Sequence, residues 1–340
     1  MRRGLIFKPP VLSKTQFAMF VFIGGVAVLA PGAARACACG CGVFDVGTSS
    51  MFPRDAGGMV FVNYDYQDQA RNWSDTGPVP TANSGDRQIR TDFTTYGLQY
   101  MFNRNWGIQV EVPYDFRDFK TLGGPTGNQV VSLKWSSLGD IRLEGIFTGF
   151  SGDMSSGLTF GVKLPTGDYA HNDAYGDIDR DSEIGTGSTD VLLGGFHRHR
   201  LTHDGSWTWF AQGLLDVPVL IQDQYRPGVE LDTAAGIYYR GWTVHGVKIM
   251  PVAQVLTSLR TSDSGNYSSG GIYDINDNPI NNPVGGRSSG YQRILLSPGI
   301  EFHIHPVSVY ADVEVPVFQD FVGNQLVAPW LFKMYVSYMF

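Results

Sequence analysis

The side chains best suited to metal chemistry fall near the start of the chain and beside a few short predicted turns. Cys37, Cys39 and Cys41 stand at alternate positions, and five histidines border two of the turns. These five are His197, His199, His203, His303 and His305. Thiolates and imidazoles together suit Cu(I) or Zn²⁺. In the competing interpretation, the histidines are ordinary turn residues and the cysteines simply oxidise. No spacing here matches a closed zinc site. The odd number of cysteines also leaves one thiol without a partner for a disulfide within the chain.

A second group of candidates consists of charged residues that alternate with apolar ones. They are Glu111, Asp115, Arg117, Asp140, Arg142, Glu144, Lys163, Asp216, Asp312, Glu314 and Lys333. If the apolar positions face outward, these charges share the inner face of a sheet. Charged side chains on such a face can hold water in the interior, pair with one another, or select a passing solute.

Four of these charges stand two residues before a proline. The motifs are Glu111-Val112-Pro113, Asp216-Val217-Pro218, Glu314-Val315-Pro316 and the charge-swapped Lys163-Leu164-Pro165. Proline cannot donate to a sheet ladder, so each should mark a bulge or the end of pairing near a rim. One interpretation is strand termination with ordinary solvated charges. The alternative is a mostly acidic ring near the outer mouth, with Lys163 as its counter-charge.

A run of alternating carboxylates, Asp177, Asp179, Asp181 and Glu183, follows in a predicted loop. Alternating carboxylates can converge on Ca²⁺, but an EF-hand loop needs glycine where Ser182 stands, so we expect a solvated acidic loop. A hydrolase would need serine, histidine and a carboxylate at one rim, and the outer loops offer only His171. We therefore predict no catalytic residue, no enzymatic activity and no cofactor.

The elements that carry these residues are predicted to be twelve strands, each with period-2 alternation and turn residues between. They are Met59–Asp68, Thr91–Phe102, Trp106–Arg117, Leu138–Thr148, Gly157–Pro165, Ser188–His197, Trp207–Val219, Val229–Tyr239, Trp242–Thr257, Gln292–Phe302, Val307–Phe318 and Pro329–Phe340. Short connections alternate with long ones rich in Gly, Asn, Asp and Ser. The long ones are Gln67–Arg90, Asp118–Ser137, Thr166–Gly187 and Ser258–Tyr291. This pattern predicts an all-β, antiparallel up-and-down transmembrane β-barrel, with short periplasmic turns and long outer loops.

The last predicted strand strengthens that prediction. Trp330, Tyr338 and Phe340 lie toward the two ends of its apolar face, as the aromatic girdles of a membrane strand do. The chain stops on Phe340, and a terminal Phe on an amphipathic strand is similar to the assembly signal of bacterial outer-membrane barrels. We expect Phe340 to serve as that signal, with the barrel-assembly machinery and outer-membrane lipid as partners.

The beginning of the chain predicts export. A basic leader, an apolar run of 14 residues from Phe17 to Ala30, and Ala34-Arg35-Ala36 before Cys37 together read as a cleaved signal peptide. The predicted organisation is a signal peptide over 1–36, a periplasmic segment with the cysteines over 37–58, and the barrel over 59–340. The predicted location is the bacterial outer membrane. Charged residues make up 17% and the net charge is −7, which gives no basic footprint for nucleic acid.

Several motifs resemble one family. Gly161-Val162-Lys163-Leu164-Pro165-Thr166-Gly167-Asp168 followed by Gly185-Thr186-Gly187-Ser188-Thr189-Asp190 is similar to outer-membrane proteins assigned to the MetA pathway of phenol degradation. The stretches Leu138-Gly139-Asp140-Ile141 and Pro316-Val317-Phe318-Gln319-Asp320 share this resemblance. It implies a barrel that passes aromatic or other hydrophobic small molecules. Our expectation is therefore a channel for small solutes, hydrophobic or aromatic ones included. The alternative is a barrel that anchors a periplasmic Cu or Zn site or an interaction segment.

The terminal aromatic gives the first test. Phe340→Ala, or deletion of Phe340, should lower the yield of assembled barrel far more than Met339→Ala, because only the terminal aromatic is read as a signal. The fraction of heat-modifiable, folded protein in isolated outer membranes measures this yield. Equal losses in the Phe340 and Met339 variants would contradict a recognition role.

Overall fold

The computed structural model describes residues 52–53, 55–81, 85–123, 129–173, 176–178, 180–265 and 289–340. The chain separates into two units, Met1–Ala33 and Ala34–Phe340, and everything described here belongs to the second. The predicted signal peptide and Cys37, Cys39 and Cys41 lie outside the described residues. No helix among the described residues is long and apolar enough to cross a membrane.

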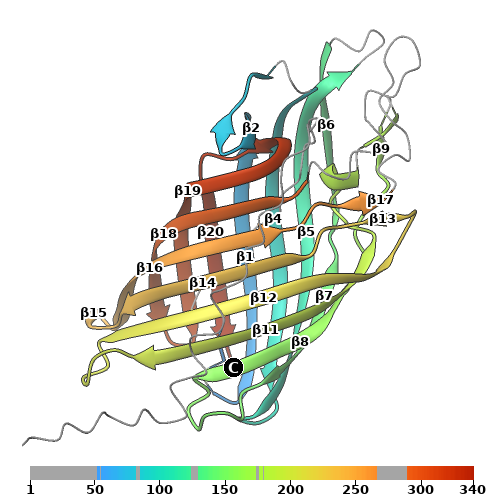
Figure 1. Cartoon of the computed structure of the whole chain (residues 1–340). Coiled ribbons are helices and arrows are strands. Elements are labelled where there is room, and N and C mark those ends of the chain that lie inside the picture. Colours follow the sequence, from blue (N-terminus) through green and yellow to red (C-terminus); the bar gives the residue numbers. More distant parts are fainter. Residues whose placement is uncertain are drawn as a thin grey trace, which may run out of the picture. The chain divides into compact units, whose positions relative to one another are not determined.

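A closed antiparallel barrel of twelve wall strands forms the second unit (Figure 1). The wall strands are β1 (Gly57–Gln69), β4 (Asp86–Met101), β5 (Trp106–Gly123), β7 (Ile141–Phe147), β8 (Ser156–Leu164), β11 (Ser188–Arg200), β12 (Trp207–Ile221), β14 (Glu230–Tyr239), β16 (Val247–Arg260), β18 (Tyr291–Ile304), β19 (Val307–Val327) and β20 (Leu331–Met339). Closure comes from β1, which pairs with β4 on one side and with β20 on the other. The β1–β20 register runs from Met59 opposite Met339 to Gln67 opposite Leu331. The predicted fold class is confirmed.

Short extra elements lie at the two ends of the wall. They are β2 (Arg71–Asp75), β3 (Gly77–Pro78), β6 (Gln129–Leu138), β9 (Asn172–Asp173), β10 (Gly176–Asp177), β13 (Tyr225–Arg226), β15 (Trp242–Val244), β17 (Ser264–Gly265) and a single 3₁₀ turn, η3 (Arg180–Ser182). The end that carries the long connections is the upper end in Figure 1.

Several predicted boundaries are wrong: β19 continues past Phe318 to Val327, β4 begins at Asp86 and not at Thr91, and two further differences change the connections. The stretch 118–137 is not an irregular loop, because β5 continues to Gly123 and pairs with β6 as a projecting hairpin. The predicted strand from Trp242 is two strands, since β15 and β16 form their own hairpin. His245 and Gly246 both have positive φ, which matches the tight two-residue turn between these strands.

The four proline motifs behave as predicted. Pairing of β5 passes from β7 to β6 at Pro113, and β8 ends just before Pro165. The ladders of β12 and β19 each shift register beside the proline, opposite Asp190 for Pro218 and opposite Leu295 for Pro316. Because proline has no N–H to donate, the ladder must skip or stop at each of these positions.

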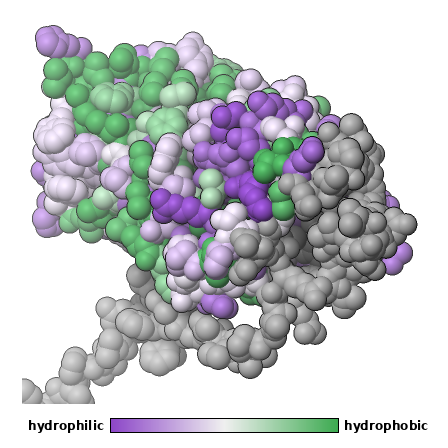
Figure 2. Space-filling view, turned by 90° about the horizontal axis from the view of Figure 1, so that it is seen from above, coloured by the Kyte–Doolittle hydropathy of each residue, from purple (hydrophilic) through white to green (hydrophobic). Residues whose placement is uncertain are grey.

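The outer surface of the wall is apolar and carries two aromatic girdles. At the short-turn end, Trp106 lies 4.6 Å from Phe147 and Trp207 lies 5.1 Å from Tyr239, measured between ring centroids. Near the long-loop end, the rings of Tyr66 and Trp330 are 5.7 Å apart. Seen from that end, hydrophilic side chains gather toward the middle of the coloured surface, and hydrophobic ones follow the wall (Figure 2). These girdles are those expected of a barrel in a bilayer.

The two faces of β5 give a matched pair of substitutions. Val110 pairs with Leu98 and Leu143 in one outward apolar patch midway between the girdles, whereas Glu111 faces the lumen. Val110→Arg should therefore lower the stability of the folded barrel by about 2–4 kcal/mol, and Glu111→Gln should change it little. Urea titration of the refolded protein in lipid vesicles measures both. A larger loss from the Glu111 variant would mean that the strand faces are reversed.

Candidate functional site

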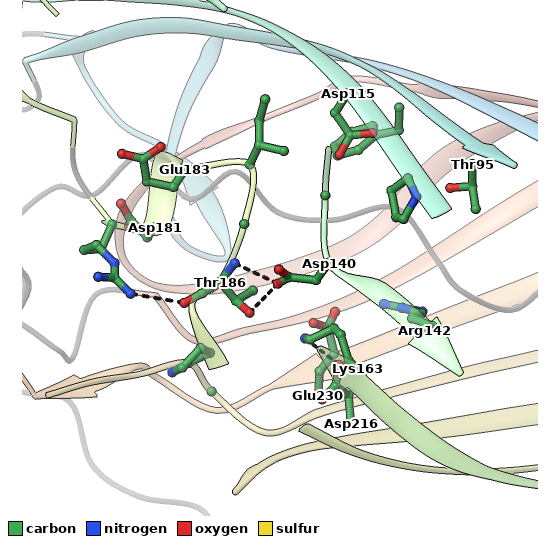
Figure 3. A pocket seen from close by; sticks show the side chains of 18 of the residues that line it. Thr95, Asp115, Asp140, Arg142, Lys163, Asp181, Glu183, Thr186, Asp216 and Glu230 are labelled. Carbon is green, nitrogen blue, oxygen red and sulfur yellow. Dashed lines mark hydrogen bonds and ion pairs between the residues drawn. The ribbon is translucent and has the colours of Figure 1, made fainter. Parts of the chain in front are cut away.

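Among the described residues, twelve charged side chains line a cavity of about 180 Å³ in the upper half of the lumen. We name it the charged chamber (Figure 3). Its acidic lining residues are Glu111, Asp115, Asp140, Asp181, Glu183, Asp216 and Glu230. Its basic lining residues are Arg117, Arg142, Lys163, Arg180 and Arg260. Carboxylates and cations therefore share one small enclosure, in which each needs partners because water is scarce.

Seven of the sequence-predicted lumen residues meet at this chamber, although they come from five separate strands or connections. They are Glu111, Asp115, Arg117, Asp140, Arg142, Lys163 and Asp216. The central contact is the Lys163 ammonium, whose Nζ donates to Asp216 Oδ2 at 2.8 Å and also contacts the Asp190 carboxylate. Lys163 is thus the cation between Asp190 and Asp216, whereas the predicted acidic ring also included Glu314. Whether the group selects solutes stays a prediction.

The remaining predicted lumen residues face inward elsewhere. Glu144 lines a lower cavity of about 50 Å³. Asp312 accepts hydrogen bonds from Gln254, Ser297 and Tyr310 within the opposite wall. Lys333 lies 3.7 Å from both Glu314 and Asp65. The proline motif of Glu314 therefore contributes its charge to a buried cluster away from the chamber.

The described residues of the connection between β8 and β11 (165–173, 176–178 and 180–187) enter the mouth of the barrel; we name them the inward loop. Arg117 of β5 donates from Nη1 to the carbonyl oxygens of Ser182 and Glu183, at 2.5 and 2.9 Å. Asp140 accepts from the Thr186 N–H at 2.8 Å, the Thr186 hydroxyl at 2.6 Å and the Gly167 N–H at 3.0 Å. Figure 3 shows the two Thr186 bonds. Two wall residues therefore hold both ends of the loop.

Arg180 fixes the middle of the inward loop. Its guanidinium carbon lies 4.8 Å from the ring centroid of Tyr169 and 5.0 Å from that of Tyr225. It also donates to the Thr186 carbonyl oxygen at 3.2 Å and pairs with Asp223 at 3.2 Å. A desolvated arginine between two aromatic rings is a strong anchor, because cation–π attraction grows as water is removed.

The prediction of a solvated acidic loop is wrong at Glu183. Glu183 is only 6% exposed, and its Oε1 accepts the His171 N–H at 2.9 Å. Burial raises the pKa of the Glu183 carboxyl to about 8, and the Asp168 carboxylate adds to the rise against the opposing effects of Arg117 and Arg180. Glu183 belongs to the loop and not to a wall strand. Its protonation is therefore linked to loop docking.

Apolar side chains border the chamber on both sides. Above it, Ile178 and Ile184 of the inward loop pack with Ile89, Phe119, Trp135 and Leu326. Below it, a larger buried cluster reaches the short-turn end, where Phe52 stacks on Phe196 with ring centroids 4.7 Å apart and meets Phe210 edge-on. Phe52 precedes β1 and is 3% exposed. The lumen is thus charged between two apolar barriers.

Three cavities follow one another down the lumen because neighbouring ones share lining residues. The charged chamber and the 50 Å³ cavity share Glu111 and Arg142. The 50 Å³ cavity and a vestibule of about 430 Å³ at the short-turn end share Phe52, Pro53 and Gln99. Phe52 lines both of the lower cavities.

Sequence reasoning missed Arg180, Glu230 and Arg260 of the chamber. Glu230 and Arg260 occupy the ends of β14 and β16, opposite one another in the ladder. Their alternation with Leu231 and Leu259 was the available signal. For Arg180 the sequence offered no signal, because nothing local shows that a long loop turns inward.

Of the residues predicted to bind a metal, the structure describes the histidines and not the cysteines. The rings of His197 and His199 are 6.2 Å apart and those of His303 and His305 are 6.5 Å apart. His197 Nδ1 contacts the Ser156 hydroxyl, and His303 Nδ1 contacts the Ser308 hydroxyl. Within the described ranges, no three His, Cys, Asp or Glu residues are grouped to hold a metal ion. His203 lies in the turn between β11 and β12. The metal hypothesis, which also needs the cysteines, stays a prediction.

Loop docking should depend on pH through Glu183. A carboxyl whose pKa is raised on docking stabilises the docked loop fully below its ordinary value of 4.5, and this contribution is lost as pH rises through about 8. Hydrogen-exchange protection factors of the Gly185 and Thr186 amides should therefore fall between about pH 5 and about pH 9. Glu183→Gln should flatten this dependence, and the Leu193 amide in β11 serves as the wall control. An unchanged pH dependence in the Gln variant would exclude Glu183 as the cause.

Comparison with known proteins supports the fold. No family model matches the chain, and no curated protein matches it, so the resemblance to the MetA-pathway proteins stays a prediction. Among solved structures, an outer-membrane channel from Pseudomonas putida F1 is similar with a TM-score of 0.61 at 10% identity, over 87% of this chain and 100% of that one. The β domain of the Bordetella autotransporter BrkA is less similar, with a TM-score of 0.49 at 12% identity, over 84% and 100%. The Pseudomonas putida toluene transporter TodX has a TM-score of 0.41 at 9% identity, over 92% and 98%. This chain has the fold of an outer-membrane β-barrel.

Proposed function

We propose that this protein is a gated outer-membrane channel for small solutes. The observation that carries the proposal is the series of linked cavities, from the charged chamber through the 50 Å³ cavity to the 430 Å³ vestibule. A barrel that served only as an anchor would need no such series, because inward side chains can fill a barrel of this size. The partners of a channel are the lipid around it and the solute within it.

We propose that two groups of contacts close the lumen, one at each end. They differ in their chemistry, and neither belongs to the hydrogen-bond ladder of the wall. On the outer side, the inward loop is held by polar contacts of Arg117, Asp140 and Arg180. On the periplasmic side, the Phe52 ring packs between Phe196 and Phe210. The Phe52 segment is also tied to the wall, since Arg198 Nη2 donates to the Pro53 carbonyl oxygen at 3.0 Å. Displacing either closure leaves the wall hydrogen bonds intact.

The side chains that line the lumen favour solutes that carry both a polar and an apolar group. A purely hydrocarbon solute in the chamber would separate charges from their partners and leave them desolvated, which is costly. The barrier below is lined by aromatic and aliphatic side chains and suits a ring or short apolar chain. We therefore propose small aromatic or hydrophobic solutes that also carry a polar group. This narrows the solute class that the sequence resemblance implies.

The periplasmic closure gives the test. Phe52→Ala removes the stacked ring without changing a wall strand, so single-channel conductance in planar bilayers should rise severalfold over that of the unmodified protein. Phe150→Ala is the matched control, because Phe150 is 60% exposed at the short-turn end and should leave conductance unchanged. A barrel that conducts in neither form, even after Phe52→Ala is combined with Asp140→Ala, would be sealed, and the channel proposal would fail.

A further inference from the structure

A second vestibule at the short-turn end has a different character from the cavities of the proposed pathway. It has a volume of about 460 Å³, which lies in the range of small-molecule sites. Three arginines line it, Arg198, Arg200 and Arg240, with Asp153 as the acidic lining residue. We name it the basic vestibule. None of its lining residues lines the charged chamber.

Strand register places the basic groups side by side on the lumen face. Arg200 and Thr208 are partners across β11 and β12, and Thr208 and Tyr238 are partners across β12 and β14. On β11, Arg198 and Arg200 continue the face of Leu192 and Phe196, both of which are buried in the lumen. Arg240 follows Tyr238 by two residues, and its N–H donates to the Ser206 carbonyl oxygen, which extends the ladder. These side chains therefore face the mouth of the lumen and not the lipid.

Two observations indicate that the vestibule can bind an anion. Arg200 and Arg240 are exposed, and neither forms an ion pair within the part of the chain that the structure describes. The second observation is the Thr208 hydroxyl. Thr208 is 3% exposed and lines the vestibule, and its Oγ1 has no hydrogen-bond partner among the described residues. A buried hydroxyl without a partner costs free energy, and a ligand oxygen would supply the bond.

The one carboxylate in the vestibule does not neutralise the arginines. Asp153 Oδ1 accepts the Ser155 N–H at 3.1 Å, and the Asp153 side chain forms no ion pair within the described ranges. Arg198 is engaged differently, because its Nη2 donates to backbone carbonyl oxygens, Pro53 at 3.0 Å and Asp153 at 3.4 Å. It is thereby held rigidly at the edge of the cavity. The vestibule keeps a net positive charge.

We propose that the basic vestibule binds a small soluble phosphate monoester from the periplasm. The guanidinium groups of Arg200 and Arg240 each offer a planar fork of donors that matches phosphate oxygens, and Thr208 offers a hydroxyl beside them. A phosphate dianion has enough oxygens to accept from all three. The cavity leaves room for an organic group beyond the phosphate. This site does not depend on the channel proposal.

Equilibrium binding tests the site without transport. The full-chain protein in detergent is titrated with glycerol 2-phosphate by calorimetry, with glycerol as the uncharged control. The double variant Arg200→Ala/Arg240→Ala should bind at least about tenfold more weakly, and Thr208→Val severalfold more weakly. Arg71→Ala is the matched control, since Arg71 is an exposed arginine at the long-loop end and should not change binding. Heat-modifiable migration in gels confirms that each variant is folded.

Three outcomes would overturn the proposal. The first is no saturable binding of glycerol 2-phosphate at about 10 mM. The second is binding that both the double variant and Thr208→Val retain in full. The third concerns lipid headgroups. If the site takes a soluble ligand, glycerol 2-phosphate should bind equally in phosphatidylcholine and phosphatidylglycerol nanodiscs. Loss of binding only with phosphatidylglycerol would assign the vestibule to lipid.

Discussion

Every feature of this barrel depends on the pairing of β1 with β20. In hydrocarbon no water is present to satisfy backbone N–H and C=O groups, so a membrane sheet must have no open edge. The register from Met59–Met339 to Gln67–Leu331 removes that edge by joining the first wall strand to the last. Closure in turn forces alternate side chains into a confined lumen. The charged chamber, the apolar barriers and the vestibules are consequences of that confinement.

Confinement explains why the interior charges are arranged as pairs. Lys163 with Asp190 and Asp216, and Lys333 with Asp65 and Glu314, each bring a cation to carboxylates from neighbouring strands. An isolated charge would carry a desolvation cost of several kcal/mol in such a site, whereas a paired and hydrogen-bonded one recovers much of it. The same logic applies to the inward loop, whose backbone polar groups are satisfied by Arg117 and Asp140. A loop can enter the lumen only when the wall supplies such partners.

Different interactions stabilise the two apolar barriers along the lumen. The outer one depends on hydrogen bonds and a buried arginine, so it responds to charge and to protonation of Glu183. The inner one depends on ring packing around Phe52, so it responds to volume and to apolar contact. Between them, the chamber offers charges of both signs. In the channel that we propose, a solute would meet both environments in turn.

The sequence by itself determined the wall: the period-2 alternation, the aromatic girdles at Trp330 and Tyr338, and the ladder breaks at the prolines all follow from local geometry. It also placed Glu111, Asp115, Arg117, Arg142, Lys163 and Asp216 on the inner face, because a strand has only two faces. Only the tertiary structure decided that the inward loop enters the barrel mouth, that Arg180 and Glu183 are buried, and that Phe52 packs against Phe196 and Phe210. These facts depend on partners more than twenty residues away in the chain, and such contacts leave no periodic trace in a single sequence.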